Sequence, residues 1–479
     1  MDLLNHNHHT LANPAFGHSR RIVMSKWSIR KQGMTLPELW QKMEEVSTEN
    51  INYNTDPILG FPGTPPTEVS VMALEMFATA HPNNIGCHTK KKRAERGFQG
   101  TQKLERELIY TIATLAGSTN PKVKVDGYIC NGGTEGNDHG MWLGRNKLLS
   151  TDTKGRYGIA VLTSFLGHYS IEKSFGRLFL NPPGIKEHTF QPLLPNGNGE
   201  LTASIVEDAI RQSYGNGYRR FLLVLTAGTT NLGSVDRIPE ISILLKTLEG
   251  ELGIATHVHV DAAFGGFVLP FLEPGYPFGF QNAAVDSISI DLHKMGYAPY
   301  SSGAFLCRKG ILRHTTTDAT YLASHEDSTV CGSRAGAVVV ASWASINSLG
   351  WAGYQKRIQH CLSLRDYLRE RLGEFNQREQ SPRVKFYPSR MNVLTVWFSK
   401  DLAKAIKAKD PIRKNNSIMD RFCIPDDNHF PREPGGAFWN AQSGSNVRVF
   451  RFVLMPHVTY DKIDQFVAEL KRKLLAQVA

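Results

Sequence analysis

The feature that most constrains this 479-residue chain is a series of short apolar segments that alternate with helical segments between residues 125 and 309. Strands buried on both faces form near-continuous apolar runs, and helices between them act as crossovers. The alternation therefore predicts an α/β fold with a mostly parallel sheet covered by helices on both faces. The expected strands are residues 125–130, 157–164, 220–229, 256–264, 284–291 and 302–309.

The flanking segments predict further helices and a smaller C-terminal α+β domain. The helix at 101–115 opens on a Thr, which is expected to cap it. The further expected elements are helices at 36–46, 101–115, 135–149, 202–212 and 333–375, strands at 384–399 and 446–456, and a helix from Tyr460. The expected domains are an N-terminal tail and arm helix (1–82), a large α/β domain (83–345), and a bridging helix with a small α+β domain (346–479).

Composition narrows the possible function classes. The net charge is +11, but no nucleic-acid-binding motif accompanies the one dense basic run, Lys90 to Arg93. This run is either a solvated face or a basic surface near a site for anionic ligands. Six scattered cysteines without a CxxC pair indicate a reducing, cytoplasmic compartment and no structural metal. We expect no membrane span and no signal peptide, and we assign the N-terminal histidines to a tail.

Three of the expected strands are followed by residues that could bind a ligand or take part in a reaction. They lie at the sheet edge where α/β proteins bind ligands. Residues 131–135 (NGGTE) combine two glycines with a helix start, which suits a phosphate. Asp261 follows one buried strand, where a capping role is equally possible. Lys294 follows another, where burial would depress the pKa of its amine and make it nucleophilic. Singly, each residue also fits an ordinary structural role.

Together these residues are the parts that pyridoxal 5′-phosphate (PLP) requires. The segments HVDAAFGGFVLPFL (259–272) and DSISIDLHKMGYAP (286–299) resemble the group II PLP-dependent amino-acid decarboxylases. The resemblance runs from about Asn83 to the C-terminus and is nearest the archaeal tyrosine/aspartate decarboxylase type. Glutamate and histidine decarboxylases and sphingosine-1-phosphate lyase are relatives. It implies PLP fold type I, with a large mostly parallel domain and a smaller C-terminal domain.

The resemblance also implies residue roles. Lys294 would form the Schiff base with PLP, and Asp261 would keep the pyridine nitrogen protonated. His168, in SFLGHYSIEKSF, and Ala263 would pack on opposite faces of the ring. The remaining implied cofactor contacts are Gly132, Gly133, Thr134 and His293 near the phosphate, and Thr226 and Thr229 beside the ring.

Other implied roles involve a second subunit or the substrate. Gly332 and Ser333 would reach the phosphate of a neighbouring subunit, which implies a homodimer with shared active sites. Tyr321 would protonate the product carbanion, although a packed loop tyrosine is equally expected. Arg451 would hold the substrate α-carboxylate. Arg448, which we place on the same strand face, is the competing candidate.

The function implied is α-decarboxylation of an acidic or aromatic L-amino acid to the amine and CO₂ through a quinonoid intermediate. The alternatives are a PLP-dependent carbon–carbon lyase of the sphingosine-1-phosphate lyase type and a binding protein without activity. The joint presence of Lys294, Asp261 and His168 argues against the binding protein. The sequence departs from several relatives at Asn131-Gly132 and at Asp291-Leu292.

Overall fold

The computed structural model describes residues 29–30, 32–90, 95–151, 153, 157–180, 187–377, 382–409, 416–431 and 446–478. The chain divides into two units, Met1–Asn52 and Tyr53–Ala479. In the first unit, α1 (Leu36–Thr48) forms where the sequence predicts a helix. Thr35 and Glu38 close a capping box at its start, so the first turn has its N–H donors satisfied. The N-terminal histidines and Lys91–Arg93 lie outside the described residues.

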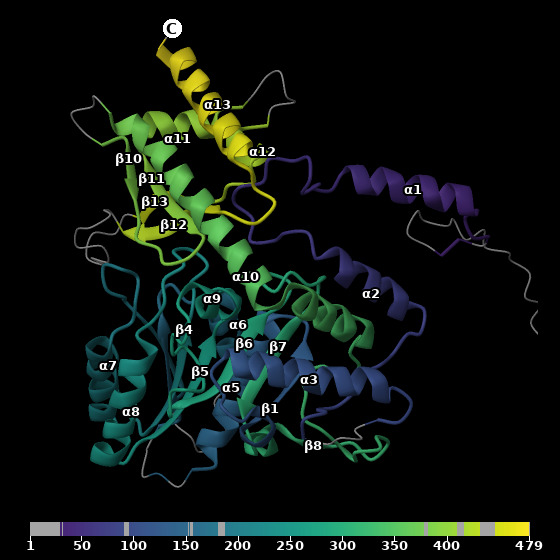
Figure 1. Cartoon of the computed structure of the whole chain (residues 1–479). Coiled ribbons are helices and arrows are strands. Elements are labelled where there is room, and N and C mark those ends of the chain that lie inside the picture. Colours follow the sequence, from purple (N-terminus) through teal and green to yellow (C-terminus); the bar gives the residue numbers. More distant parts are fainter. Residues whose placement is uncertain are drawn as a thin grey trace, which may run out of the picture. The chain divides into compact units, whose positions relative to one another are not determined.

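The second unit is built on a seven-stranded sheet in the order β1-β7-β6-β5-β4-β2-β3 (Figure 1). Only β7 runs antiparallel to its neighbours β1 and β6, so the predicted mostly parallel sheet is confirmed. The strands are β1 (Val125–Cys130), β2 (Ile159–Ser164), β3 (Thr189–Leu193), β4 (Arg220–Thr226), β5 (Ala255–Asp261), β6 (Val285–Asp291) and β7 (Gly303–Arg308). The sequence predicts all of these except the edge strand β3, which contains a proline.

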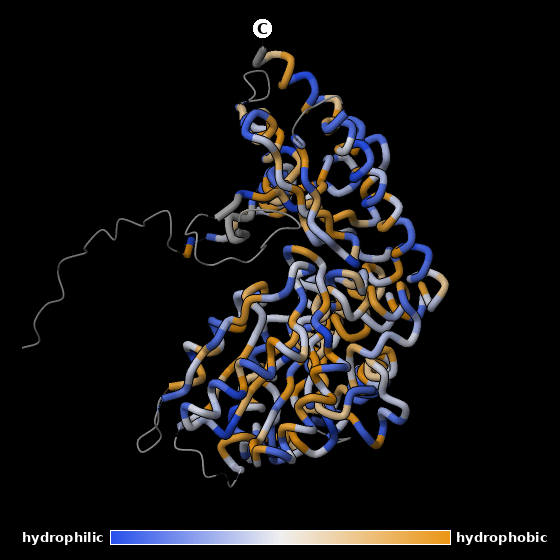
Figure 2. Tube along the Cα trace, turned by 90° about the vertical axis from the view of Figure 1, so that its left-hand side faces the viewer, coloured by the Kyte–Doolittle hydropathy of each residue, from blue (hydrophilic) through white to orange (hydrophobic). Residues whose placement is uncertain are grey.

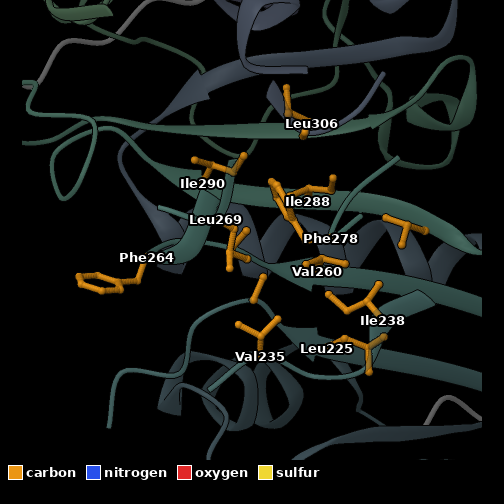
Figure 3. Packing of buried hydrophobic residues seen from close by; sticks show 14 of the residues in the cluster. Leu225, Val235, Ile238, Val260, Phe264, Leu269, Phe278, Ile288, Ile290 and Leu306 are labelled. Carbon is orange, nitrogen blue, oxygen red and sulfur yellow. The ribbon is translucent and has the colours of Figure 1, made fainter. Parts of the chain in front are cut away.

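The two faces of this sheet differ in polarity. Val260 of β5, Ile288 of β6 and Leu306 of β7 pack with Leu269 and Phe278 in the main hydrophobic core (Figure 3). The opposite face of β5 and β6 carries alternating polar residues, which lie under α5 (Gly133–Leu149). These polar residues are His257, His259, Asp261, Ser287, Ser289 and Asp291. Because strand side chains alternate between faces, one face is apolar and the other carries the chemistry.

Helices on both sides of the sheet complete this part of the fold. The remaining helices before the C-terminal region are α2 (Glu68–Ala78), α3 (Gln99–Leu115), α4 (Pro121–Lys124), α6 (Tyr169–Leu178), α7 (Ala203–Gly215), α8 (Ile238–Leu252), α9 (Leu269–Leu272) and α10 (Gly336–Gly373). The prediction that Thr101 caps its helix is wrong, because α3 begins at Gln99 and the Thr101 hydroxyl donates to Asn84 Oδ1 at 2.6 Å. Gly350 interrupts α10 with φ 58° and produces a kink.

The C-terminal region forms a four-stranded sheet in the order β10-β11-β13-β12, and α10 reaches it from the large sheet (Figure 1). Its strands are β10 (Val384–Phe386), β11 (Val393–Phe398), β12 (Asp426–Pro431) and β13 (Asn446–Val453), and its helices are α11 (Lys400–Lys407), α12 (Ile418–Arg421) and α13 (Tyr460–Val478). Hydrophobic and hydrophilic stretches alternate along α13 (Figure 2). The predicted strand at 384–399 is two strands, because Pro388 interrupts it.

The C-terminal region has its own hydrophobic cluster, in which Leu59 takes part alongside residues of β11, β13 and α13. The backbone of Leu59 pairs with Phe422 and Val453, so a segment from before the large sheet contributes to this region. The predicted boundaries after residues 82 and 345 stay predictions. Over the described residues, no helix has the length and hydrophobicity needed to cross a membrane.

Candidate active site

A cavity of about 540 Å³ opens where β1, β4, β5 and β6 end. Its wall includes the start of α5, the start of α6, and the residues that directly follow β4, β5 and β6. Parallel strands deliver their carboxyl ends to one edge of a sheet, and this edge is where α/β proteins bind ligands. The fold therefore brings together chain segments that are more than 150 residues apart, such as Gly132 and Lys294.

The start of α5 forms one end of the cavity. Gly132 has φ 145°, a backbone conformation that other residues rarely adopt. A side chain at Gly133 would lie 2.9 Å from the Ala263 methyl carbon, so only glycine fits there. Among the described residues, no side chain caps the α5 start with a hydrogen bond, and a helix start with open N–H groups attracts anions. This end of the cavity suits a phosphate.

Asp261 lies at the end of β5 and is 5% exposed. Its Oδ1 accepts the backbone N–H of Ala263 at 3.1 Å, and its Oδ2 accepts the Nδ2–H of Asn137 at 2.8 Å. These two donors hold the carboxylate in one orientation at the cavity wall. Such a fixed carboxylate can bind a protonated ring nitrogen.

Lys294 follows β6, and its Nζ lies 2.7 Å from Asp291 Oδ2. Burial acts to lower the pKa of Lys294, but the Asp291 carboxylate outweighs it and the pKa is raised above its usual value. The expectation of a depressed lysine pKa is therefore wrong for this state of the protein. The reason is an acidic partner three residues earlier, which an argument from burial alone omits.

Two histidines complete the cavity wall. His168 caps α6, and its Nδ1 accepts hydrogen bonds from the hydroxyl and the N–H of Ser170. Burial lowers the pKa of His168, which favours the neutral ring. His293 accepts the N–H of Ser302 at Nδ1 and stacks on Tyr300 at 4.3 Å, and burial lowers its pKa too.

The cavity wall contains most of the site residues that the resemblance implies. The remaining ones lie outside the cavity that their own chain forms. The nine residues in its wall are Gly132, Gly133, Thr134, His168, Thr226, Asp261, Ala263, His293 and Lys294. Outside it, the Thr229 hydroxyl bonds to Ser234 Oγ at 2.7 Å and holds a turn. Ser333 accepts a hydrogen bond from Asn83 Nδ2, and Gly332 precedes it in the same loop. Val330 and Cys331 of that loop do reach the cavity.

The residues assigned to the substrate lie further away. Tyr321 is 83% exposed, between β8 (Thr317–Asp318) and β9 (Glu326–Asp327). Arg451 donates to Asn231 Oδ1 at 3.3 Å, next to Thr230 in the cavity wall. Placing Arg448 on the same strand face is wrong, because it lies three positions before Arg451 and strand side chains alternate between faces. Arg448 pairs with Asp426 at 3.0 Å instead.

Sequence reasoning missed Asn137 and Asp291, which both line the cavity. The signal that could have found this polar layer is the strict alternation in HVHVD and DSISID, which marks one polar face on each strand. Asp291 Oδ1 is buried without a hydrogen-bond partner among the described residues, close to Gly132 and Gly133. Such an atom indicates a site that a ligand completes.

The geometry fits PLP. The α5 start would hold the phosphate, Asp261 the pyridine nitrogen, and Lys294 the aldehyde carbon, and all three face one cavity. Gly132, with its unusual backbone conformation, and Asp291, with its unpartnered oxygen among the described residues, both lie in the wall of this cavity.

Comparisons with known proteins agree with this fit. The pyridoxal-dependent decarboxylase conserved domain matches residues 158–384. A probable L-aspartate decarboxylase of Archaeoglobus fulgidus is 30% identical over 415 residues, covering 86% of this chain and 93% of the relative. A tryptophan decarboxylase of Clostridium sporogenes is 28% identical over 449 residues, covering 91% and 96%.

A solved structure shows the same fold. L-methionine decarboxylase from Streptomyces sp. 590, in complex with L-methionine methyl ester, superposes with a TM-score of 0.72 over 93% of this chain and 96% of that chain, at 17% identity. The architecture is that of PLP fold type I. The chain therefore belongs to the pyridoxal-dependent decarboxylase family and is a PLP-dependent amino-acid carboxy-lyase.

Proposed function

We propose that the protein decarboxylates an acidic or aromatic L-amino acid at Cα and releases the amine and CO₂. The observation that carries this proposal is the meeting of Lys294, Asp261, His168 and the α5 start in one cavity. Two relatives support the substrate range, since one is named for aspartate and the other for tryptophan. The cavity wall includes the aromatic side chains of Tyr169 and Phe264 and the cation of Lys173.

Each group in the cavity has a distinct task. PLP, when bound, supplies a ring that accepts the electrons of the bond between Cα and the carboxylate. The Asp261 carboxylate keeps a proton on the ring nitrogen. The Lys294 amine would attach the cofactor, and for this it must leave its ion pair with Asp291 and lose a proton. Ala263 and Phe264 keep water from the reacting carboxylate, which favours loss of neutral CO₂.

The proposal includes a homodimer with shared active sites. In its own chain Tyr321 is exposed and outside the cavity. Gly332 and Ser333 lie outside it too, in a loop of which Val330 and Cys331 reach the cavity. This placement is consistent with residues that serve the partner's cavity. In the partner's cavity Tyr321 would donate the proton to Cα. Arg451 would bind the α-carboxylate in the cavity of its own chain, from the side of Thr230.

A substrate panel tests the reaction. The PLP-loaded protein is incubated with each of the proteinogenic amino acids and with a phosphorylated sphingoid base, and CO₂, amine and aldehyde are measured. We expect amine and CO₂ from an acidic or aromatic amino acid, and no product with Lys294→Ala. A long-chain aldehyde without CO₂ would instead identify a carbon–carbon lyase.

Mixed dimers test the shared site. Lys294→Ala and Tyr321→Phe chains are each expected to be inactive. A hybrid dimer with shared sites would contain one cavity that has both intact residues, so mixing the two chains should restore activity. No recovery in hybrids verified by native mass spectrometry would show that each cavity takes Lys294 and Tyr321 from the same chain.

A further inference from the structure

Asn137 of α5 lies in the cavity wall and has no role in the function proposed above. It is 1% exposed, and all four hydrogen-bonding positions of its amide are used. Nδ2 donates to Asp261 Oδ2 at 2.8 Å and to Ser170 Oγ at 3.0 Å. Oδ1 accepts from His259 Nε2 at 3.0 Å and from Ser289 Oγ at 2.5 Å. One buried amide of α5 thus connects β5 and β6 of the sheet to the start of α6.

The chemistry of these partners fixes which way the amide points. A carboxylate only accepts hydrogen bonds, so the NH₂ of Asn137 must face Asp261. His259 must then carry its hydrogen on Nε2, and its Nδ1 accepts from Ser287 Oγ at 2.9 Å. The Ser287 oxygen accepts in turn from His257 Nε2 at 3.2 Å. Every donor in this row points toward Asp261.

Burial supports a single protonation state along the row. It lowers the pKa of His257 to about 4 and the pKa of His259 to about 3. Each ring is therefore neutral at pH 7 and carries one hydrogen. A neutral imidazole donates from one nitrogen and accepts at the other, which is the arrangement the row requires.

The second branch of the network ends at His168. Ser170 accepts from Asn137, so the Ser170 hydroxyl hydrogen is free to point at His168 Nδ1, 2.8 Å away. The backbone N–H of Ser170 also donates to this Nδ1, at 3.3 Å. The neutral His168 ring therefore carries its hydrogen on Nε2. Asn137 is connected both to the proposed partner of the ring nitrogen and to the proposed stacking residue.

The close approach of α5 to the sheet leaves little space for the network to rearrange. Gly136, Gly140 and Gly144 form one stripe of this helix. A methyl group at these positions would lie 2.6 Å from Ser289, 2.2 Å from His259 and 2.5 Å from His257. The helix therefore rests directly on the polar strand residues, and the amide is enclosed on all sides.

We propose that Asn137 is a positioning residue, oriented by His259 and Ser289, that fixes the orientation of the Asp261 carboxylate and keeps His168 in its Nε2–H form. The inference rests on the proposed function, in which these two residues contact the pyridine ring. Loss of the Asn137 N–H donors would weaken the interaction between Asp261 and the protonated ring nitrogen. The effect should therefore appear in cofactor binding as well as in turnover.

Asn137→Asp tests the inference with little change of shape. The new carboxylate would face Asp261 without a donor unless one of the pair takes up a proton. The PLP dissociation constant is measured by fluorescence titration, and ring-¹⁵N-labelled PLP reports by NMR whether its nitrogen is protonated. We expect PLP affinity to fall about 10- to 100-fold, as for loss of a hydrogen bond to a charged group, and the ¹⁵N signal to move toward neutral pyridine.

A matched pair of variants guards against a folding defect. His259 and His139 are both buried histidines that stack on Phe305, but His139 bonds to Tyr128 and Thr315 and has no link to Asp261. His259→Phe should weaken PLP binding about 3- to 10-fold, since Ser289 still orients the amide. His139→Phe should leave PLP affinity within about twofold, and circular dichroism checks the fold of all variants.

The outcomes separate this inference from the proposed function. If Asp261→Asn leaves the ¹⁵N signal unchanged, the proposed role of Asp261 fails. If Asp261→Asn moves the signal but Asn137→Asp changes neither the signal nor PLP affinity, the positioning role alone is overturned. Equal weakening by His259→Phe and His139→Phe would also overturn it.

Discussion

The ion pair between Lys294 and Asp291 makes the reactivity of the lysine depend on its acidic neighbour. At 2.7 Å and an effective dielectric constant of about 20, the attraction between the two charges is about 6 kcal/mol. Asp291→Asn removes this charge but leaves the burial, which acts to lower the pKa of Lys294, so the Lys294 pKa should fall.

The assay is the rate at which the PLP-free protein attaches PLP, followed by absorbance between pH 6 and 9.5. Only the neutral amine reacts, so the wild-type rate should climb about tenfold per pH unit, and the Asp291→Asn rate should level off at a lower pH. Asp126→Asn is a matched control, because Asp126 is a buried acid paired with Lys309 at 2.6 Å outside the cavity. Identical pH profiles for wild type and Asp291→Asn would refute the reasoning.

Two further predictions concern stability. Glu105 is buried and accepts hydrogen bonds from Arg334 and His88, so Glu105→Gln should lower the free energy of unfolding by about 3 to 5 kcal/mol, measured in urea; a loss below about 1 kcal/mol would contradict it. Burial holds the pKa values of His257 and His259 at about 4 and 3, below their usual 6.5. The contribution of the two neutral rings to the free energy of unfolding is therefore complete above pH 6.5 and is lost as the pH falls toward 4 and 3. His257→Gln should therefore reduce the decline in stability between pH 6 and 5 by about 1.2 kcal/mol, and an unchanged decline would argue against a neutral buried ring.

The main sheet follows from the sequence because its strands have the apolar runs that burial on both sides demands. β1 matches its predicted bounds, and β6 and β7 begin and end within one residue of theirs. The sequence pattern did not predict β3 and β12, because they lie at sheet edges and include proline or charged residues in place of an apolar run. Local patterns identify central strands better than edge strands, since only central strands need apolar side chains throughout.

The candidate site is predictable where a residue's position in the chain determines its position in space. Asp261 and Lys294 follow buried strands directly, so the parallel sheet delivers both to one edge. Asn137 and Asp291 were missed because their importance depends on hydrogen-bond partners from other elements. The raised pKa of Lys294 has the same origin, since the burial of an amine and the charge beside it act in opposite directions.

Residues that would act across a subunit interface cannot be assigned from one chain. Tyr321, Gly332 and Ser333 match a family pattern in sequence, but their own chain gives them no contact with the cavity. Thr229 was assigned to the cofactor by its motif, but its hydroxyl forms a hydrogen bond with Ser234 within a turn. A motif match gives the position of such a residue but not the partner of its side chain.

The most direct test of the central claim is to find which lysine carries the cofactor. The PLP-loaded protein is reduced with borohydride, digested, and analysed by peptide mass spectrometry, with Asp261→Asn as a variant that keeps the lysine. We predict that the pyridoxyl group is found on Lys294 in both proteins. A pyridoxyl group on another lysine, with Lys294 unmodified, would contradict the account.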